Sequence, residues 1–362
     1  MSLFATYEYT IRQRLSRMLD DCVLATVSAG AVTTATLATT NPPQFYSKAN
    51  DYFNKAEYEV YCYSGTNTGV SRLASDWDTT SKILTVTPAA GSAYDTTSLL
   101  EFHRIFPVLE LRDAVIQTIE LYAGRYLVDL DDDTTVILAE TTSNDGQTLY
   151  TYEYALPTNI LYISRVTTED SVAGYKLTGP VSGAFTLGEV VKNAGTTATG
   201  ILSYGPGTVA YILAREVSGT FAVGDTVTGE TSGQTCGALT AVESETVGDG
   251  RFPLENVVDP RDYTILKEYS PKIKFDENQY DIVDDLRIRI EGQGSQEIIS
   301  ADTDYIFLPP NDLVEVAATF LPFSKIESSN LTATFNKCMI TREKVESQHI
   351  TPAYAHAKKV IE

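Results

Sequence analysis

Apolar residues recur at helical spacing in four separate stretches of the chain, and the longest such pattern spans residues 104–129. Five residues of this stretch, three or four positions apart, fall on one side of a helix. They are Leu111, Val115, Ile119, Tyr122 and Tyr126, and Leu109 and Ile116 widen the stripe. Pro107 suits the start of the helix, and the side that carries Thr118 is expected to be polar. Such a helix needs to bury its stripe against other elements.

The other three helical patterns cover residues 4–19, 311–321 and 330–346. Pro322 is expected to end the helix over residues 311–321, because proline cannot continue a helix. The stripe of the last helix consists of Leu331, Phe335, Cys338, Met339, Arg342 and Val345. We expect the four helices to pack together as one helical core, built from residues 1–22, 105–130 and 309–347.

Most of the chain between these helices alternates apolar and polar residues, as β-strands do. Residues 23–104 are expected to form an antiparallel β module, with strands over residues 58–63, 70–75, 83–87 and 99–104. In this module residues 76–81 are expected to be a polar connection, and Trp77 is expected to be a packing anchor. A second β-sheet domain is expected from residues 131–172 and 249–308, with Ile298 and Ile299 in one of its strands. Two acidic segments, residues 127–135 and 243–251, are predicted to be connections.

One sequence pattern occurs twice, in residues 182–200 and again in residues 218–237. The matched pairs include Phe185 with Phe221, Gly188 with Gly224, and Val191 with Val227. Phenylalanine and valine suit a small core, while glycine followed by an acidic residue suits a turn. Two copies predict a paired β module over residues 173–248, entered and left through linkers at Gly174 and Gly248. The whole pattern predicts a β-rich α+β fold, with a small discontinuous four-helix core and large antiparallel β insertions.

The last segment, residues 348–362, is interrupted by Pro352 and has no evident partner within the chain. It is expected to be an extended tail that becomes ordered on a partner, because apolar residues on a free end gain by docking.

The chain has a net charge of −21, with 27 basic and 48 acidic residues, so it lacks the basic patch that grips nucleic acid. Such a charge either keeps a protein soluble or repels DNA that must pass without sticking. No apolar run is long enough to span a membrane. Cys22, Cys62, Cys236 and Cys338 are scattered, so neither a metal site nor a disulfide framework is expected.

No catalytic or cofactor motif is present, so we expect no enzyme and no cofactor. His103 is expected to be a structural histidine beside the helix over residues 104–129. Asp76 with Asp78, and Asp284 with Asp285, fall in turn-like sequence and are not expected to form a glycosidase pair.

The chain resembles the head–tail connector, or portal adaptor, proteins of tailed bacteriophages. Three strings carry the resemblance: YEVYCYSGTNTGVSRLASDWDTTSKILTVTPAA before the helix FPVLELRDAVIQTIELYAG, the ending LRIRIEGQGSQEIISADTDYIFLPPNDLVEVAATFLPF, and the repeat with FTLGEVV and FAVGDTV. The repeat departs from small adaptors, which lack it.

The resemblance implies a virion protein of the neck at the portal vertex, made in the host cytoplasm. It implies a homo-oligomeric ring, commonly of twelve subunits, between the portal protein and a tail or nozzle protein. Genomic DNA passes through such a ring without specific binding, and no membrane is involved. The tail would then reach the portal through Ile350, Tyr354, Lys358, Lys359, Val360 and Ile361.

The alternative from another class is a β-rich tail fibre or adhesin whose repeat module binds glycan. It accounts for the threonine, glycine and tyrosine content but not for four helices at these places. The oligomeric state separates the two hypotheses.

Overall fold

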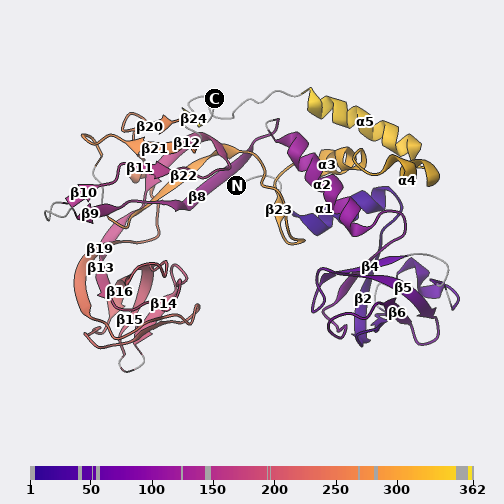
Figure 1. Cartoon of the computed structure of the whole chain (residues 1–362), viewed down its shortest axis with the longest axis horizontal. Helices are drawn as coiled ribbons and strands as arrows, with labels where there is room; N and C mark the ends of the chain where they lie inside the picture. Colours follow the sequence, from indigo (N-terminus) through magenta and orange to yellow (C-terminus); the bar gives the residue numbers. More distant parts are fainter. Residues whose placement is uncertain are drawn as a thin grey trace. The chain divides into compact units, whose positions relative to one another are not determined.

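Figure 1 shows a computed structural model of the chain. The structure describes residues 5–39, 43–50, 52–53, 58–123, 125–142, 148–193, 195, 197–267, 270–280, 284–347 and 358–360. The fold is β-rich α+β, with 38% strand and 19% helix. Two compact units divide the chain, Met1–Val128 with Ser295–Thr351, and Asp129–Gly294 with Pro352–Glu362. Within the described ranges, no helix is both long and apolar enough to cross a lipid bilayer.

The first unit contains the five α-helices found in the described residues. They are α1 (Glu8–Met18), α2 (Val108–Tyr122), α3 (Pro310–Ala318), α4 (Phe323–Ser328) and α5 (Thr332–Glu346). Helix α3 packs against α1, α2 and α5, and α1 also packs against α2 (Figure 1). The four predicted helices are therefore confirmed. Helix α4 was not predicted, because Pro322 was expected only to end a helix. In the structure Pro322 directly precedes the first turn of α4, where proline is tolerated.

Helix α2 buries its predicted stripe, and Leu111, Val115, Ile119 and Tyr122 are each at most 2% exposed. Three expectations for this helix are wrong. Tyr126 does not continue the helical stripe, because α2 ends at Tyr122. Leu109 does not widen the stripe, because its side chain is 65% exposed. Thr118 is fully buried, and its Oγ1 donates a hydrogen bond to the carbonyl of Ala114 at 2.8 Å, which satisfies a hydroxyl inside the core.

Helices α1 and α5 also differ from their predicted forms. Helix α1 begins at Glu8, because the preceding strand β1 (Thr6–Tyr7) pairs with β23 (Tyr305–Ile306). Ile298 and Ile299 were expected in a strand, but they lie between β22 and β23. Of the six residues predicted to form the apolar stripe of α5, only Cys338 and Val345 are buried.

Six antiparallel strands between α1 and α2 close into a barrel. They are β2 (Val23–Gly30), β3 (Thr34–Leu37), β4 (Glu59–Ser64), β5 (Val70–Asp78), β6 (Ile83–Thr87) and β7 (Leu99–His103), in the order β2-β3-β6-β5-β4-β7, with a 3-10 turn at Gln44–Ser47. Trp77 is fully buried in the barrel core, as predicted. The expected connection at residues 76–81 is wrong in its first half, because β5 continues to Asp78.

The two ends of the barrel insertion meet at Asp21, directly after α1. Its Oδ1 accepts the backbone amides of Arg104 and Ile105 at 2.9 and 2.8 Å, and its Oδ2 accepts that of Phe106 at 2.8 Å. One carboxylate thereby binds the segment that leads from β7 into α2.

Two small sheets share one core in the second unit. The first has the order β24-β12-β22-β8 and consists of β24 (Lys358–Lys359), β12 (Ile160–Thr168), β22 (Arg287–Gly294) and β8 (Val128–Ile137). The second has the order β11-β21-β20 and consists of β11 (Glu153–Ala155), β21 (Lys272–Phe275) and β20 (Tyr263–Leu266). Strand β9 (Glu140–Thr142) pairs separately with β10 (Thr148–Tyr150), and Leu254–Asn256 form a 3-10 turn.

The repeat lies in a curled half-barrel of seven strands, ordered β18-β17-β14-β15-β16-β13-β19. The strands are β13 (Ser171–Thr178), β14 (Val190–Asn193), β15 (Thr199–Tyr204), β16 (Tyr211–Ser218), β17 (Val227–Gly229), β18 (Thr235–Cys236) and β19 (Ala241–Gly248). The two copies pair directly, since β14 lies antiparallel to β17, and their matched phenylalanine and valine residues share one core. Gly188 and Gly224 both have positive φ, at +75° and +93°, which explains the glycine in each copy.

The two acidic segments predicted to be connections are strands. Residues 128–137 form β8, and residues 241–248 form β19, which pairs with β13 along its whole length. Gly174 and Gly248 are consequently ladder residues and not linkers. Both β8 and β19 lie at the edge of a sheet, where acidic side chains stay solvated while the backbone is paired.

The described part of the tail does have a partner within the chain. Lys358 and Lys359 pair with Ile163 and Tyr162 of β12, and Val360 is 1% exposed in the core of the two sheets. Lys358 Nζ also donates a hydrogen bond to the carbonyl of Tyr263 at 2.7 Å. The expectation of an unpaired tail is therefore wrong for residues 358–360.

Candidate functional site

The outer face of barrel strand β7 carries two titratable side chains toward α1. Because side chains alternate along a strand, Leu100 and Phe102 enter the barrel core while Glu101 and His103 point outward. Both outward residues are nevertheless at most 1% exposed. Residues of α1 contact them: Gln13 Nε2 lies 3.1 Å from Glu101 Oε1, and Ser16 Oγ lies 3.0 Å from His103 Nδ1.

Arg12 is the centre of this buried interface. Its Nη2 lies 2.7 Å from Oε1 of Glu101, and its Nη1 lies 2.9 Å from Oδ1 of Asp302. The same Nη1 bonds to the carboxylate of Glu8, one turn earlier in α1. One guanidinium group therefore joins α1, the barrel and the segment that precedes β23, using the several donors that arginine offers.

Asp302 connects the same network to α2. Its Oδ2 accepts a hydrogen bond from the hydroxyl of Tyr61 at 2.6 Å, and its Oδ1 bonds to Arg112 of α2. Arg112 also lies 3.2 Å from Tyr61 Oη and 3.7 Å from a carboxylate oxygen of Glu8. Three carboxylates thus face two guanidinium groups at a site from which water is nearly excluded.

Burial and pairing act in opposite directions on these carboxylates. Burial raises the pKa of Glu8, and the charges of Arg12 and Arg112 only partly offset it. For Glu101, burial alone would also raise the pKa. The hydrogen bond with His103 and the charge of Arg12 outweigh this effect, so the pKa is lowered. Glu101 is therefore held as a carboxylate, and removing its partners would leave an uncompensated buried charge.

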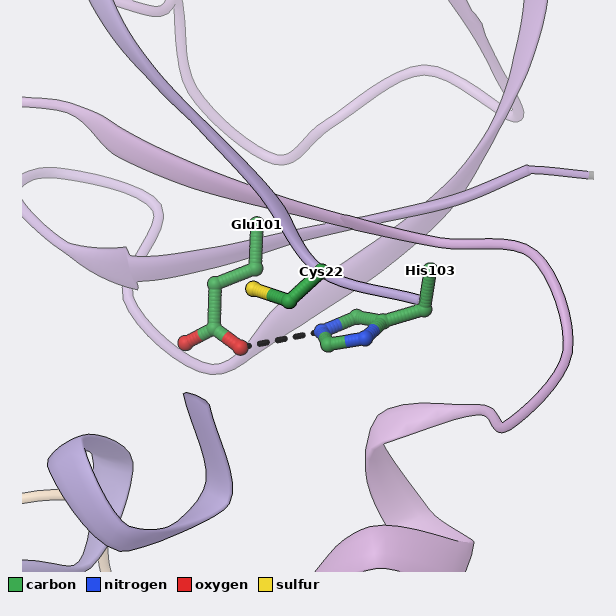
Figure 2. Close-up of side chains that lie close together, drawn as sticks. All are labelled: Cys22, Glu101 and His103. Carbon is green, nitrogen blue, oxygen red and sulfur yellow. Dashed lines mark hydrogen bonds and ion pairs between the residues drawn. The ribbon is translucent and has the colours of Figure 1, made fainter. Parts of the chain in front are cut away.

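Cys22 joins Glu101 and His103 in one cluster, shown in Figure 2. The pairing of Val23 with Phe102 places Cys22 beside His103 on the neighbouring strand. One ligand atom from each of the three side chains lies within 4.8 Å of the other two. His103 Nε2 is 3.0 Å from Glu101 Oε2, the contact that is dashed in Figure 2.

Thiolate, imidazole and carboxylate are the ligand types that zinc uses, so these three residues form the group that could hold a metal within the described part of the chain. Two observations instead favour a structural joint. Burial, and next the charge of Glu101, raise the pKa of Cys22 to about 12, which keeps the thiol protonated. Both oxygens of Glu101 already accept hydrogen bonds from Arg12, and Gln13 and His103 occupy the remaining directions. The cluster is a satisfied hydrogen-bond network that fixes the barrel on α1.

The sequence carried a weak signal of this interface. Glu101 and His103 are two residues apart in a predicted strand, so their side chains lie on the same face. Neither side chain suits a buried position without a polar partner. Arg12 lies in the predicted helix over residues 4–19, and nothing in the helical pattern marks it as buried. Its burial depends on Glu101 and Asp302, which are 89 and 290 positions away and cannot be paired with it from periodicity.

The residues predicted to bind a portal do not all fall within the described structure. Lys358, Lys359 and Val360 lie in or beside β24, whereas Ile350, Tyr354 and Ile361 lie outside the described residues. The helical-core residues Leu111, Val115, Ile119 and Tyr122 lie together on the buried side of α2.

No protein-family model matches the chain, and no curated protein or solved structure matches it significantly.

Proposed function

We propose that the protein is a structural component of a bacteriophage neck. It forms a ring that joins the portal to the tail and lines the channel through which DNA leaves. The proposal gives the chain no catalytic role, no cofactor and no membrane association, and places it at the portal vertex of the virion after synthesis in the host cytoplasm.

Helix α5 is the observation that carries the proposal. It is fifteen residues long, yet only Cys338 and Val345 are buried. Ile340 is 68% exposed, and Phe335 and Met339 are only partly covered. A helix gains most of its stability from burying an apolar side. An uncovered side of this kind favours packing against another subunit, as in a ring where helices stand next to each other.

The arrangement of the helices supports the same conclusion. Helices α1, α2, α3 and α5 pack together, although the barrel separates α1 from α2, and residues 129–294 of the second unit separate α2 from α3. We interpret this as a small discontinuous four-helix core that carries large antiparallel β insertions, which is the architecture implied by the resemblance to head–tail connectors.

The charge of the chain suits a DNA channel. A net charge of −21 disfavours adsorption of a polyanion that has to move through the ring. Helix α5 carries Lys337, Arg342 and Lys344 against Glu343 and Glu346, so its exposed side can face an acidic surface of a neighbouring copy.

The C-terminal segment is proposed to contact the portal through Ile350, Tyr354, Lys358, Lys359, Val360 and Ile361. Since Val360 is also part of the core, a deletion of the whole segment would confuse loss of folding with loss of binding. The double variant Ile350→Asp, Tyr354→Asp is the cleaner test. Co-sedimentation with the portal should be lost while the melting temperature is unchanged.

Mass photometry and negative-stain images of the purified protein, alone and with portal, test the ring. Rings or caps on the portal are expected, with twelve subunits as the commonest size implied by the resemblance. Monomers or slender trimers that bind glycan would favour the tail-fibre or adhesin alternative instead.

A variant of α5 tests whether its exposed side is the ring contact. Ile340→Asp should abolish rings without unfolding the chain. Asn336→Asp is the matched control, because it adds the same charge at an exposed position of α5 without removing an apolar side chain. Intact rings are expected for the control, and intact rings for both variants would contradict the assigned contact.

A further inference from the structure

A cavity in the second unit, with a volume of about 610 Å³, lies beside the half-barrel. Its wall includes the turn at Leu187 and Gly188, residues of β15 and β16, the segment 249–251 and the start of β22. Volumes of several hundred cubic ångströms are typical of sites for small molecules. None of these residues belongs to the interface around Arg12.

Two arginine side chains converge at this cavity. A Cβ atom placed on Gly250 would lie 3.6 Å from Nη2 of Arg287 and 3.7 Å from Nη2 of Arg215. Gly250 has a φ of +81°, so the chain turns tightly between the two guanidinium groups. Two like charges this close to one point repel each other, and the carboxylates of Glu169 and Glu216 offset part of that repulsion.

The two arginines are fixed to different degrees. Arg287 is held by Glu169, whose Oε1 lies 2.6 Å from Nη2 and whose Oε2 lies 3.1 Å from Nε. Within the described part of the chain, Arg215 forms one ion pair, with Glu216, whose carboxylate is 3.2 Å from Nη1 and whose side chain is 62% exposed. Such an exposed pair contributes little, so a ligand can displace it at small cost.

Two residues that line the cavity each carry a buried polar atom with no hydrogen-bond partner among the described residues. These atoms are Oγ of Ser203, a residue that is 8% exposed, and Nε of Arg215. Buried polar groups in proteins are almost always paired, so each unpaired one requires an explanation. Ser203 and Arg215 lie on neighbouring strands, β15 and β16, and both line the cavity.

The backbone of the wall is strained at one position. Glu216 has a φ of +50°, although it is neither glycine nor asparagine. Left-handed backbone at such residues is uncommon, and here it coincides with a β-bulge, because β15 and β16 shift register between Thr199 and Ile201.

We propose that this cavity is a binding site for a small ligand bearing an oxyanion, either a carboxylate or a phosphate. Arg215 and Arg287 contact the anionic oxygens, because guanidinium groups pair with both anions through two parallel hydrogen bonds. Ser203 donates its hydroxyl to the ligand. Asp249 also lines the cavity and acts against an anion there; its carboxylate pairs with Arg251 and accepts that residue's backbone amide.

Isothermal titration calorimetry of the full chain with inorganic phosphate and with glucuronate, at constant ionic strength, tests the site. Saturable binding of at least one of them is expected. Binding of phosphate alone identifies a tetrahedral anion, and binding of glucuronate alone identifies a carboxylate on a sugar. Arg215→Gln should raise the Kd of the bound anion by at least about tenfold. Ser203→Ala should raise it by about two- to tenfold.

Arg165→Gln is the matched control, because Arg165 pairs with Glu291 in the same unit and does not line the cavity. It should bind as the unaltered chain does. The proposal is overturned if neither anion binds with a Kd below about 10 mM, because binding weaker than that is not specific recognition. It is also overturned if Arg215→Gln, shown to be folded by its melting curve, binds with unchanged affinity.

Discussion

Arg12 of α1 and Glu101 of β7 form a fully buried ion pair, with Nη2 of the arginine 2.7 Å from Oε1 of the glutamate. Both side chains are 0% exposed. This pair, with Glu8 and Asp302 on the other side of Arg12, decides how the barrel is held on the helices of the first unit.

Replacing Arg12 by methionine keeps an unbranched side-chain stem and removes the charged guanidinium group. Glu8, Glu101 and Asp302 would then be buried without their main partner. Loss of one member of a buried ion pair costs about 3–5 kcal/mol, and we expect the first unit to unfold at a much lower urea concentration. Arg14→Met, at an exposed position of the same helix, is the matched control and should change little. Equal midpoints for the two variants would contradict this interpretation.

Ile119→Asp tests the packing of α2. Ile119 is 1% exposed, so the variant places a carboxylate in an apolar core, at a cost of several kcal/mol out of a total of about 5–15 kcal/mol. The control cannot be Thr118, which is buried as well. Gln117 is exposed on the same turn, and Gln117→Asp should lower the melting temperature only slightly. A normal melt for Ile119→Asp would show that α2 does not pack as described.

Asp285 predicts a pH dependence that can be assigned to one residue. Burial, and next the charge of Asp284, raise its pKa to about 6 from the ordinary 3.8, although Tyr211 donates a hydrogen bond to it at 2.9 Å. Between these two pKa values the folded chain holds a proton that the unfolded chain releases. The contribution of Asp285 therefore favours folding at low pH and is lost as the pH rises from about 4 to about 6.

Asp285→Asn removes this titration. The difference in melting temperature between the variant and the unaltered chain should shift in favour of the variant as the pH is raised from 4 to 7. Asparagine also tolerates the φ of +59° at this position. Glu277→Gln, at an exposed site in the same unit, should show no such shift. A difference that is independent of pH would refute the assignment to Asp285.

The half-barrel can be removed at a defined boundary. Strands β13 and β19 pair from Ser171 with Gly248 onward, and just outside them the amide of Asp249 donates to the carbonyl of Asp170 at 3.0 Å. Replacing residues 171–248 by a short glycine-serine linker should therefore preserve the helical circular-dichroism signal and the ring. Replacement of residues 173–248 would leave Ser171 and Val172 without their partners and should express less well.

Val360→Ala tests whether the chain end belongs to the core. The loss of two methyl groups from a side chain that is 1% exposed should cost about 1–3 kcal/mol in the second unit. Lys359→Ala, at an exposed neighbouring position, should be nearly neutral. Equal denaturation midpoints would show that residues 358–360 do not dock on β12 in solution.

The elements that the sequence predicted well are those with a complete local signal. Helix α2 combines a strong stripe with Pro107 at its start, and the repeat combines paired phenylalanines with glycines that need positive φ. Strands β8 and β19 were missed because edge strands keep acidic side chains in water, and this pattern is also typical of connections. Closure of the barrel depends on pairing of β2 with β7, a contact between distant residues that alternation alone does not specify.

The buried interface could not be predicted for a related reason. Glu101 and Arg12 are ordinary polar residues until the fold brings them together, and no periodicity relates a helix to a strand across the barrel. The unpaired atoms at the cavity, Oγ of Ser203 and Nε of Arg215, become noticeable only once the surrounding backbone is known.

The binding of residues 104–106 by Asp21 has a consequence for how the chain folds. Residues 19–107 separate α1 from α2, and bringing the ends of a flexible loop of that length together is costly in entropy. A barrel that closes first brings its own ends together, so α1 and α2 then meet as if a short turn connected them. The slow search between distant segments is then the closure of β2 on β7, and the meeting of α1 with α2 follows it as a local step.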